Sequence, residues 1–207
     1  MEDVLDVYQR PYDEKYPVVC VDEKSKQLIE EVQPPWPPRP AHVAKQDYEY
    51  QRQGTVNLFV AFEPLAHWRR IDVTDRRTKV DFAQFLKSLI DERYSQASKV
   101  LLVMDNLNTH KLASLYEAFP PEEARRIAAK IEIHHTPKHG SWLNMAEIEL
   151  SVLSRDIAER IGEKKQLKKV IAASVKRRNT AAKGANWQFT SSQARVKLLR
   201  LYPSIEG

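Results

Sequence analysis

The apolar run at residues 99–104, followed directly by Asp105 and Asn106, is the clearest buried strand in the sequence and limits what the rest can form around it. Its continuous Val and Leu content is typical of a strand that is covered on both faces. A chain of 207 residues, 42% of them hydrophobic, can supply one such core but hardly two. We therefore expect one α/β domain with appendages.

Further strands and helices are predicted on both sides of this run. Residues 16–21 predict a strand, and residues 26–32 predict a second strand that pairs back onto it. Additional strands are expected at residues 55–62, 68–73 and 131–135. Helical spacing of apolar residues predicts helices at residues 80–94, on both sides of Pro120, and at 142–161, 164–178 and 191–201, with 142–161 buried. The proline-rich residues 34–40 predict a connecting loop.

The charges are distributed unevenly along the chain. Residues 163–207 contain eleven Lys and Arg against two Glu, a net charge of +9, so residues 1–162 carry −4 of the total of +5. A basic tail on an acidic body fits a polyanion-binding appendage, although a solvated helix face explains the lysines equally well. The candidate DNA-binding residues are Lys164, Lys165, Lys168, Lys169, Lys176, Arg177 and Arg178.

Three acidic residues stand where predicted elements end or begin. Asp22 follows the first strand, Asp105 follows the central strand, and Glu147 lies early in the long helix. Carboxylate oxygens are the ligands that hard divalent cations prefer. Two cations about 3.5–4 Å apart can activate an attacking oxygen and stabilise a leaving oxygen at phosphorus. Taken singly, each residue is explained as well by a turn or a helix cap.

Three segments carry a family resemblance: residues 20–23 (Cys-Val-Asp-Glu), residues 103–111 around Asp105, and residues 141–147 (Ser-Trp-Leu-Asn-Met-Ala-Glu). They resemble the acidic blocks of mariner-like DDE transposases, and residues 48–59 and 187–203 extend the resemblance to the bacterial insertion-sequence "six-thirty" family. The resemblance implies an RNase H-like fold, a mixed five-stranded sheet flanked by helices with a basic helical C-terminal tail. It also implies DNA strand cleavage and strand transfer with two Mg²⁺ or Mn²⁺ ions on Asp22, Asp105 and Glu147.

The same resemblance sets expectations for domains and partners. Residues 1–162 are expected to form the catalytic domain and residues 163–207 the tail, acting as a homodimer on double-stranded DNA of transposon ends and target. Only 21 residues precede Asp22, too few for the helix-turn-helix region that normally comes first. We therefore expect that region to be absent. The chain is then a second reading frame joined to an upstream frame by frameshifting, a truncated relic, or one domain of a longer protein, and the sequence does not decide among these.

Glu149 competes with Glu147 for the third ligand position. The two residues are about 200° apart around a helix, so both cannot face the same metals, and periodicity does not decide between them. The family's Asn-x-x-Glu pattern favours Glu147. Glu23 should point away from Asp22 into a structural ion pair. Asp72 and Asp75 are also interpreted as structural.

Side chains at the rim of the site are predicted at Asn106, His110, His139 and Asn144. His134 and His135 stand close to His139, but the paired cysteines typical of a structural zinc site are missing. One histidine at the rim, His110 or His139, is a candidate for contacting phosphate or orienting water.

Two other classes of function were weighed. A non-catalytic or relic nucleic-acid-binding protein of the same fold would have lost one acidic ligand, and all three are present. A nucleotide-binding enzyme is set aside because the five glycines cannot form a phosphate-binding loop. The single Cys20, the absence of a signal peptide and the absence of a membrane segment predict a cytoplasmic, nucleoid-associated protein.

Overall fold

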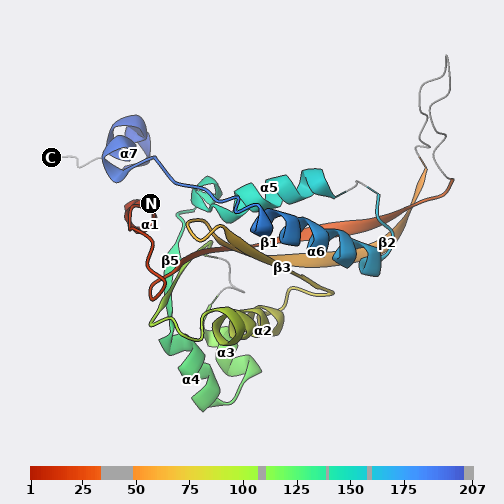
Figure 1. The fold of residues 1–207 in the computed structure, drawn as a ribbon, viewed down its shortest axis with the longest axis horizontal. Helices are drawn as coiled ribbons and strands as arrows, with labels where there is room; N and C mark the ends of the chain where they lie inside the picture. Colours follow the sequence, from red (N-terminus) through yellow and green to blue (C-terminus); the bar gives the residue numbers. More distant parts are fainter. Residues whose placement is uncertain (34–48, 107–110, 139, 158–159, 203–207) are drawn as a thin grey trace.

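A five-stranded mixed sheet forms the centre of the computed structural model, which describes residues 1–33, 49–106, 111–138, 140–157 and 160–202 (Figure 1). The strand order is β3-β2-β1-β4-β5. β1 pairs antiparallel with β2 and parallel with β4; β2 pairs antiparallel with β3, and β4 parallel with β5. The strands are β1 (Val18–Glu31), β2 (Tyr50–Glu63), β3 (Trp68–Thr74), β4 (Val100–Met104) and β5 (Ile131–His135).

The first strand is longer than expected. The predicted strands at residues 16–21 and 26–32 are one continuous strand, so the second does not pair back onto the first. The residues between the two predicted strands belong to the same strand: Lys24 and Ser25 pair with Leu58 and Asn57 of β2. Beyond this point β1 and β2 continue as a two-stranded arm (Figure 1). The proline-rich loop expected at residues 34–40 lies outside the described residues.

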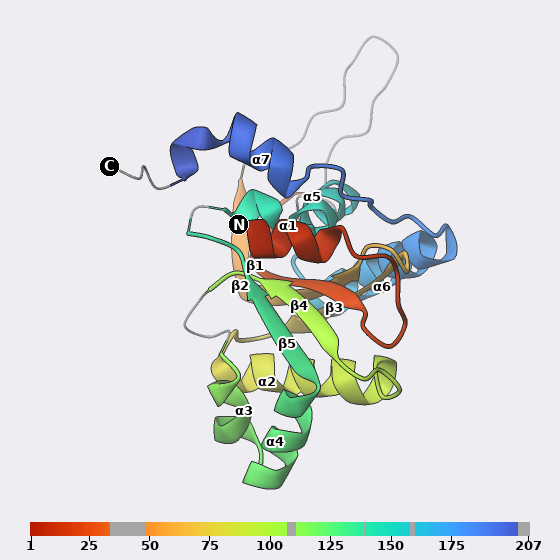
Figure 2. The same ribbon diagram turned by 90° about the vertical axis from the view of Figure 1, so that its left-hand side faces the viewer.

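One face of the sheet is covered by α2 (Lys79–Ser88), α3 (Ala113–Ala118) and α4 (Pro121–Ala129), the lower layer in Figure 2. α2 continues into a π-helical turn, η1 (Leu89–Arg93), as expected for a helix over residues 80–94. Val19 and Val21 of β1 point into this core together with Phe59 and Phe82. Val21 and Asp22 are neighbours on a strand, so Asp22 points to the opposite face.

The opposite face is covered by α1 (Glu2–Tyr8), the 3-10 turn η2 (Ser141–Leu143), α5 (Ala146–Asp156), α6 (Lys164–Thr180) and α7 (Ser191–Lys197), which runs into η3 (Leu199–Leu201). α1 and α7 lie side by side above β4 and β5 (Figure 2). Cys20 and Val103 point into this second layer. The sheet is therefore the middle of three layers.

Two helices on this face differ from expectation. The helix predicted over residues 142–161 is the shorter α5, because Ile157 has extended backbone angles and Ser141–Leu143 forms a separate turn. Ile157 and Ile161 are nevertheless buried, which explains why apolar periodicity overestimated the helix. α5 is also buried on one side only, since Glu147 and Ile148 are exposed. The helix α1 was not predicted.

The basic tail contributes to the same core as the rest of the chain. Leu167 and Ile171 of α6 pack with Leu58 of β2 and Leu153 of α5. Ala194 of α7 is buried in the cluster that contains α1, and α7 begins with a capping box formed by Thr190 and Gln193. No helix among the described residues has the length and apolar character needed to span a membrane.

Candidate active site

Asp22 lies on β1, and Asp105 directly follows β4, the parallel neighbour of β1. Val18, Val19 and Cys20 pair with Leu101, Leu102 and Val103, so continuing the register by two residues sets Asp22 beside Asp105. Neighbouring strands are about 4.8 Å apart, and residues two apart on a strand share a face. Both carboxylates therefore belong to the face that carries Cys20, the one covered by α5. Burial raises the pKa of the Cys20 thiol to about 12, and the negative charge of Asp22 adds to this increase.

A hollow of about 550 Å³ opens beside Asp105 at the carboxyl ends of β4 and β5. Its walls contain carboxylate, amide, hydroxyl and ammonium groups, and its lining residues are Asp105, Asn106, Thr136, Pro137, Lys138, Gly140 and Ser141. The Thr136 amide donates to the Met104 carbonyl at 2.9 Å, and His135 Nδ1 lies 3.2 Å from the Asp105 carbonyl. These contacts fix the backbone on which Asp105 stands. The carboxyl edge of the central strands is where ligands bind in open α/β sheets.

Asn144 joins the start of α5 to the strand that carries Asp22. Its Nδ2 donates to the Val21 carbonyl at 2.9 Å, and its Oδ1 accepts from the Ala146 amide at 3.1 Å. The Glu147 amide donates to the Asn144 carbonyl at 3.1 Å. Asn144, predicted at the rim, is therefore buried and bridges β1 to the first turn of α5, where Glu147 stands.

Tyr8 of α1 supports the same junction from the other side. Its hydroxyl donates to the Leu143 carbonyl at 2.7 Å and lies 3.3 Å from Cys20 Sγ. The Met145 amide in turn donates to the Tyr8 oxygen at 3.4 Å. The spacing of Val4, Leu5 and Tyr8 is the only sequence signal for this helix, and it is too short to be distinctive.

Glu147 and Glu149 lie in opposite surroundings on α5. Glu147 is exposed, whereas Glu149 is 3% exposed and forms ion pairs with Arg69 of β3 at 3.0 Å and Arg178 of α6 at 2.7 Å. Asn179 completes this cluster by bonding the Arg69 amide and carbonyl, both at 2.9 Å. Glu149 therefore has a structural role, which leaves Glu147 as the carboxylate of this helix that is open to a ligand.

The side chains of the three acidic residues are not gathered into one metal site in the described structure. Within the part of the chain that the structure describes, no group of three or more His, Cys, Asp or Glu side chains is close enough to hold a metal ion. Strand register sets Asp22 at the level of Asp105. Asn144 holds the first turn of α5, where Glu147 stands, against Val21 of β1. Carboxylates repel one another when no cation lies between them.

The other predicted rim residues divide into two groups. Asn106 lines the hollow next to Asp105, while His110 and His139 lie outside the described residues. His134 is buried between Asp3 at 2.9 Å and Glu132 at 3.2 Å.

Glu23 pairs with Arg77 at 3.1 Å, as its predicted structural role requires. Asp72 pairs with Arg70 at 2.9 Å and Asp75 with Lys164, so both are also structural.

The seven basic residues proposed for DNA binding are not equivalent. Lys165, Lys168, Lys169 and Lys176 are exposed on α6. Arg178 is held by Glu149, and Lys164 and Arg177 are held by Asp75 and Asp156. The sequence could not separate these roles, because the acidic partners lie 21 to 89 residues away along the chain.

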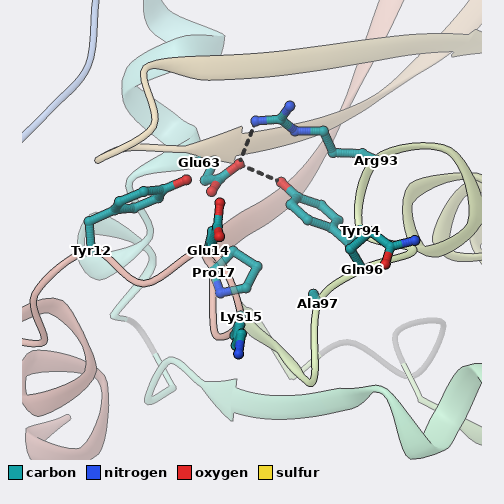
Figure 3. A pocket seen from close by; sticks show the side chains of 9 residues that line it. All are labelled: Tyr12, Glu14, Lys15, Pro17, Glu63, Arg93, Tyr94, Gln96 and Ala97. Carbon is teal, nitrogen blue, oxygen red and sulfur yellow. Dashed lines mark hydrogen bonds and ion pairs between the residues drawn. The ribbon is translucent and has the colours of Figure 1, made fainter.

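A second hollow, of about 480 Å³, lies at the opposite edge of the sheet (Figure 3). Tyr12 and Glu14 point into it toward the buried carboxylate of Glu63. Glu63 accepts hydrogen bonds from Tyr94 at 3.0 Å and from Arg93 at 3.3 Å. Most residues that line this hollow precede β1 or β4, whereas Asp22 lies within β1 and Asp105 directly follows β4.

Solved structures with a similar fold are complexes of the Mos1 transposase. A Mos1 paired-end complex with the left transposon end matches with a TM-score of 0.58 and 14% identity over 87% of this chain and 55% of the Mos1 chain. A Mos1 mariner paired-end complex with Mn matches with a TM-score of 0.54 and 15% identity over 89% and 60%. The Mos1 strand transfer complex gives a TM-score of 0.53 and 15% identity over 89% and 59%.

These matches confirm the RNase H-like fold, and they show that the chain spans a little over half the length of the Mos1 chains. No curated protein sequence matches. The sequence model described as DDE superfamily endonuclease matches residues 17–168, a range that contains Asp22, Asp105 and Glu147. The chain therefore belongs to the DDE superfamily of endonucleases.

Proposed function

We propose that this chain is the catalytic domain of a bacterial insertion-sequence transposase, which cuts DNA strands at the ends of the element and joins them to a target. One geometric relation carries the proposal. The shared register of β1 and β4 sets Asp22 beside Asp105, on the sheet face over which α5 begins. Membership of the DDE endonucleases supports phosphodiester cleavage as the reaction to which this pair of carboxylates contributes.

Asp22, Asp105 and Glu147 would hold Mg²⁺ or Mn²⁺, since their oxygen donors suit hard cations and one Mos1 structure is described with Mn. Two bound ions would activate the attacking oxygen and stabilise the leaving oxygen of an in-line displacement. Asn144 keeps the first turn of α5 against β1, which holds Glu147 near the strand ends. Lys138 in the adjoining hollow is suited to contact a phosphate of the substrate.

The expected partner is double-stranded DNA bound by two copies of the chain. The Mos1 chains with a similar fold are described in paired-end and strand transfer complexes, one of them with a transposon end. The exposed lysines of α6 then serve as contacts to DNA phosphates, and the protein would be found with the nucleoid.

The proposal is tested by metal-dependent cleavage of supercoiled plasmid DNA. Asp105→Asn and Glu147→Gln should each lose more than the roughly 10–100-fold that partners outside the ligand set typically cost. Mn²⁺ binding, followed by electron paramagnetic resonance, should weaken in the same variants. The matched control is Glu122→Gln, which removes one exposed carboxylate from α4 and should leave both readouts unchanged.

Equal activity in Asp105→Asn and the native chain would refute the assignment of the site. A native chain that binds DNA but neither binds Mn²⁺ nor cleaves DNA would instead favour the alternative function, a non-catalytic or relic nucleic-acid-binding protein of this fold.

A further inference from the structure

An aromatic cluster stands next to the hollow beside Asp105. The Trp142 ring is stacked on the Trp187 ring, with a centroid separation of 6.3 Å and an interplanar angle of 26°, and lies 6.4 Å from the Phe189 ring. Trp187 in turn packs against Tyr8 at 5.3 Å. The cluster therefore joins the turn before α5 to the segment before α7 and to α1.

Trp142 is the exposed member of this cluster. Its exposed fraction is 46%, while the neighbouring Leu143 is fully buried and its carbonyl is held by Tyr8. The burial of Leu143 and its hydrogen bond with Tyr8 therefore hold the turn that carries Trp142 in place. Trp187 and Phe189 support the ring from behind, since both are partly buried in the core. Because Trp142 is already held in one position, another flat ring can stack on it without the entropic cost of ordering the side chain.

The location of Trp142 relates it to the candidate active site. Ser141 and Gly140 line the hollow together with Asp105, and the Trp142 Cα is one 3.8 Å step further along the chain. Two residues later, Asn144 bonds the backbone beside Asp22. A group that lies on Trp142 is therefore close to a phosphate that lies in the hollow.

Cations accompany the aromatic surface. Lys138 is exposed in the wall of the hollow, and Lys197 Nζ lies 5.9 Å from the centroid of the Phe189 ring. This arrangement suits a nucleotide, because the aromatic face can stack on the flat base while the ammonium groups contact the anionic phosphate. An apolar protein partner would leave these charges without a counterpart.

We propose that Trp142 stacks on an unpaired nucleobase next to the phosphate that is cut, and so acts as a positioning residue for the DNA strand. This inference rests on the proposed function, because it takes DNA as the substrate. Enzymes that act inside a duplex commonly extrude a base and hold it against an aromatic side chain. Stacking on Trp142 would hold such a strand while the carboxylates act on the neighbouring phosphate.

The test uses fluorescein-labelled oligothymidine of about 20 nucleotides and an abasic strand of the same length, with binding followed by anisotropy in the presence of a chelator. Trp142→Ala should weaken binding of oligothymidine roughly 5- to 100-fold, the range typical of base stacking. Its binding of the abasic strand should be unchanged. Trp142→Phe should restore most of the affinity, because it keeps an aromatic ring. Tyr116→Ala removes an aromatic ring of similar exposure from α3 and is the matched control.

A second readout separates stacking from a loss of fold. A single 2-aminopurine in the oligothymidine should be quenched by the native chain and by Trp142→Phe, but not by Trp142→Ala. Equal weakening on both strands in Trp142→Ala, or unchanged quenching, would overturn the proposal. Because these measurements need no metal, stacking by the native chain is measured separately from the metal-dependent cleavage of plasmid DNA. Failure of stacking is thus distinguished from failure of the proposed catalysis.

Discussion

At the scale of single residues, Glu149 is buried between two arginines, Arg69 and Arg178. Arg69 is 1% exposed, and burial lowers the pKa of its guanidinium while the charge of Glu149 opposes that shift. A further hydrogen bond from Arg69 reaches the Lys183 carbonyl. The cluster ties β3, α5 and α6 together, so it sets the position of the helix that carries Glu147.

Glu149→Gln should therefore destabilise the fold. Removing one partner of a buried ion pair leaves uncompensated charge and commonly costs about 3–5 kcal/mol. Glu147→Gln is the control two residues away, and an exposed substitution of this kind should change the free energy of unfolding by no more than about 0.5 kcal/mol. Urea unfolding followed by circular dichroism measures both. Equal midpoints for the two variants would contradict the structural role of Glu149.

Glu63, in the hollow at the far edge of the sheet, gives a prediction about pH (Figure 3). Burial raises its pKa above the ordinary value, although Tyr94 and Arg93 oppose the shift. A carboxyl group whose pKa is higher in the folded state binds its proton more tightly there, so it contributes stability at low pH. That contribution is lost as pH rises from the ordinary glutamate pKa through the raised one.

Glu63→Gln removes this titration. The free energy of unfolding of the variant, relative to the native chain, should therefore increase as pH is raised from about 4 to 7. Parallel urea titrations across this pH range measure the difference, and Glu14→Gln, an exposed carboxylate in the same hollow, is the control. A difference that is independent of pH would show that Glu63 has no raised pKa.

At the scale of the elements, α2 begins with a capping box. The Thr78 side chain accepts from the Asp81 amide at 3.2 Å, and the Asp81 carboxylate accepts from the Thr78 amide at 2.8 Å. Thr78→Ala should cost about 1 kcal/mol in the free energy of unfolding, because the Asp81 amide loses its acceptor. Thr78→Ser keeps the hydroxyl and should cost little. If Thr78→Ser lowered the unfolding temperature more than Thr78→Ala, loss of the cap could not explain the destabilisation.

Elements that are defined by periodicity could be predicted from the sequence, whereas those defined by distant contacts could not. The strand at residues 131–135 and the helix α6 were predicted almost to the residue, since apolar spacing alone marks them. β1 was divided in two because its polar middle is stabilised by β2, which lies some 30 residues further on. α1 was missed because its seven residues are helical mainly through packing on η2 and α7.

In the candidate site, too, features that follow from local patterns could be predicted and features that depend on distant contacts could not. Asp105 directly follows β4 as predicted, whereas Asp22, predicted at the end of a strand, lies within β1. That the two residues lie at the same level depends on strand register, which no local pattern encodes. The choice of Glu147 over Glu149 came from family resemblance, because helical periodicity left both at the border of the buried face. The arginines that explain the choice are separated from Glu149 by 80 and 29 residues.

At the scale of the whole molecule, the basic tail is both a structural layer and a charged surface. Leu167 and Ile171 are buried in the core, so deleting the tail would remove part of that core. The outer side of α6 can be altered without this penalty. Lys165, Lys169 and Lys176 lie within about 40° of one another around the helix and extend over roughly 16 Å. This lysine stripe is the surface best suited to follow a phosphate backbone.

The last prediction concerns how this stripe contributes to DNA binding. Each phosphate contact releases condensed counterions, so the logarithm of the binding constant falls with the logarithm of salt concentration by about 0.9 per contact. Replacing Lys165, Lys169 and Lys176 with Gln should lower that slope by up to about 2.7, and equally for duplexes of unrelated sequence, because phosphate contacts carry no base information. A control with the same loss of charge replaces Arg10, Lys15 and Arg125, which are exposed outside α6. Anisotropy titrations at several salt concentrations would measure both slopes. If the control lowered the slope as much as the α6 variant, the net charge of the molecule would account for binding, and the lysine stripe could no longer be assigned as the DNA contact.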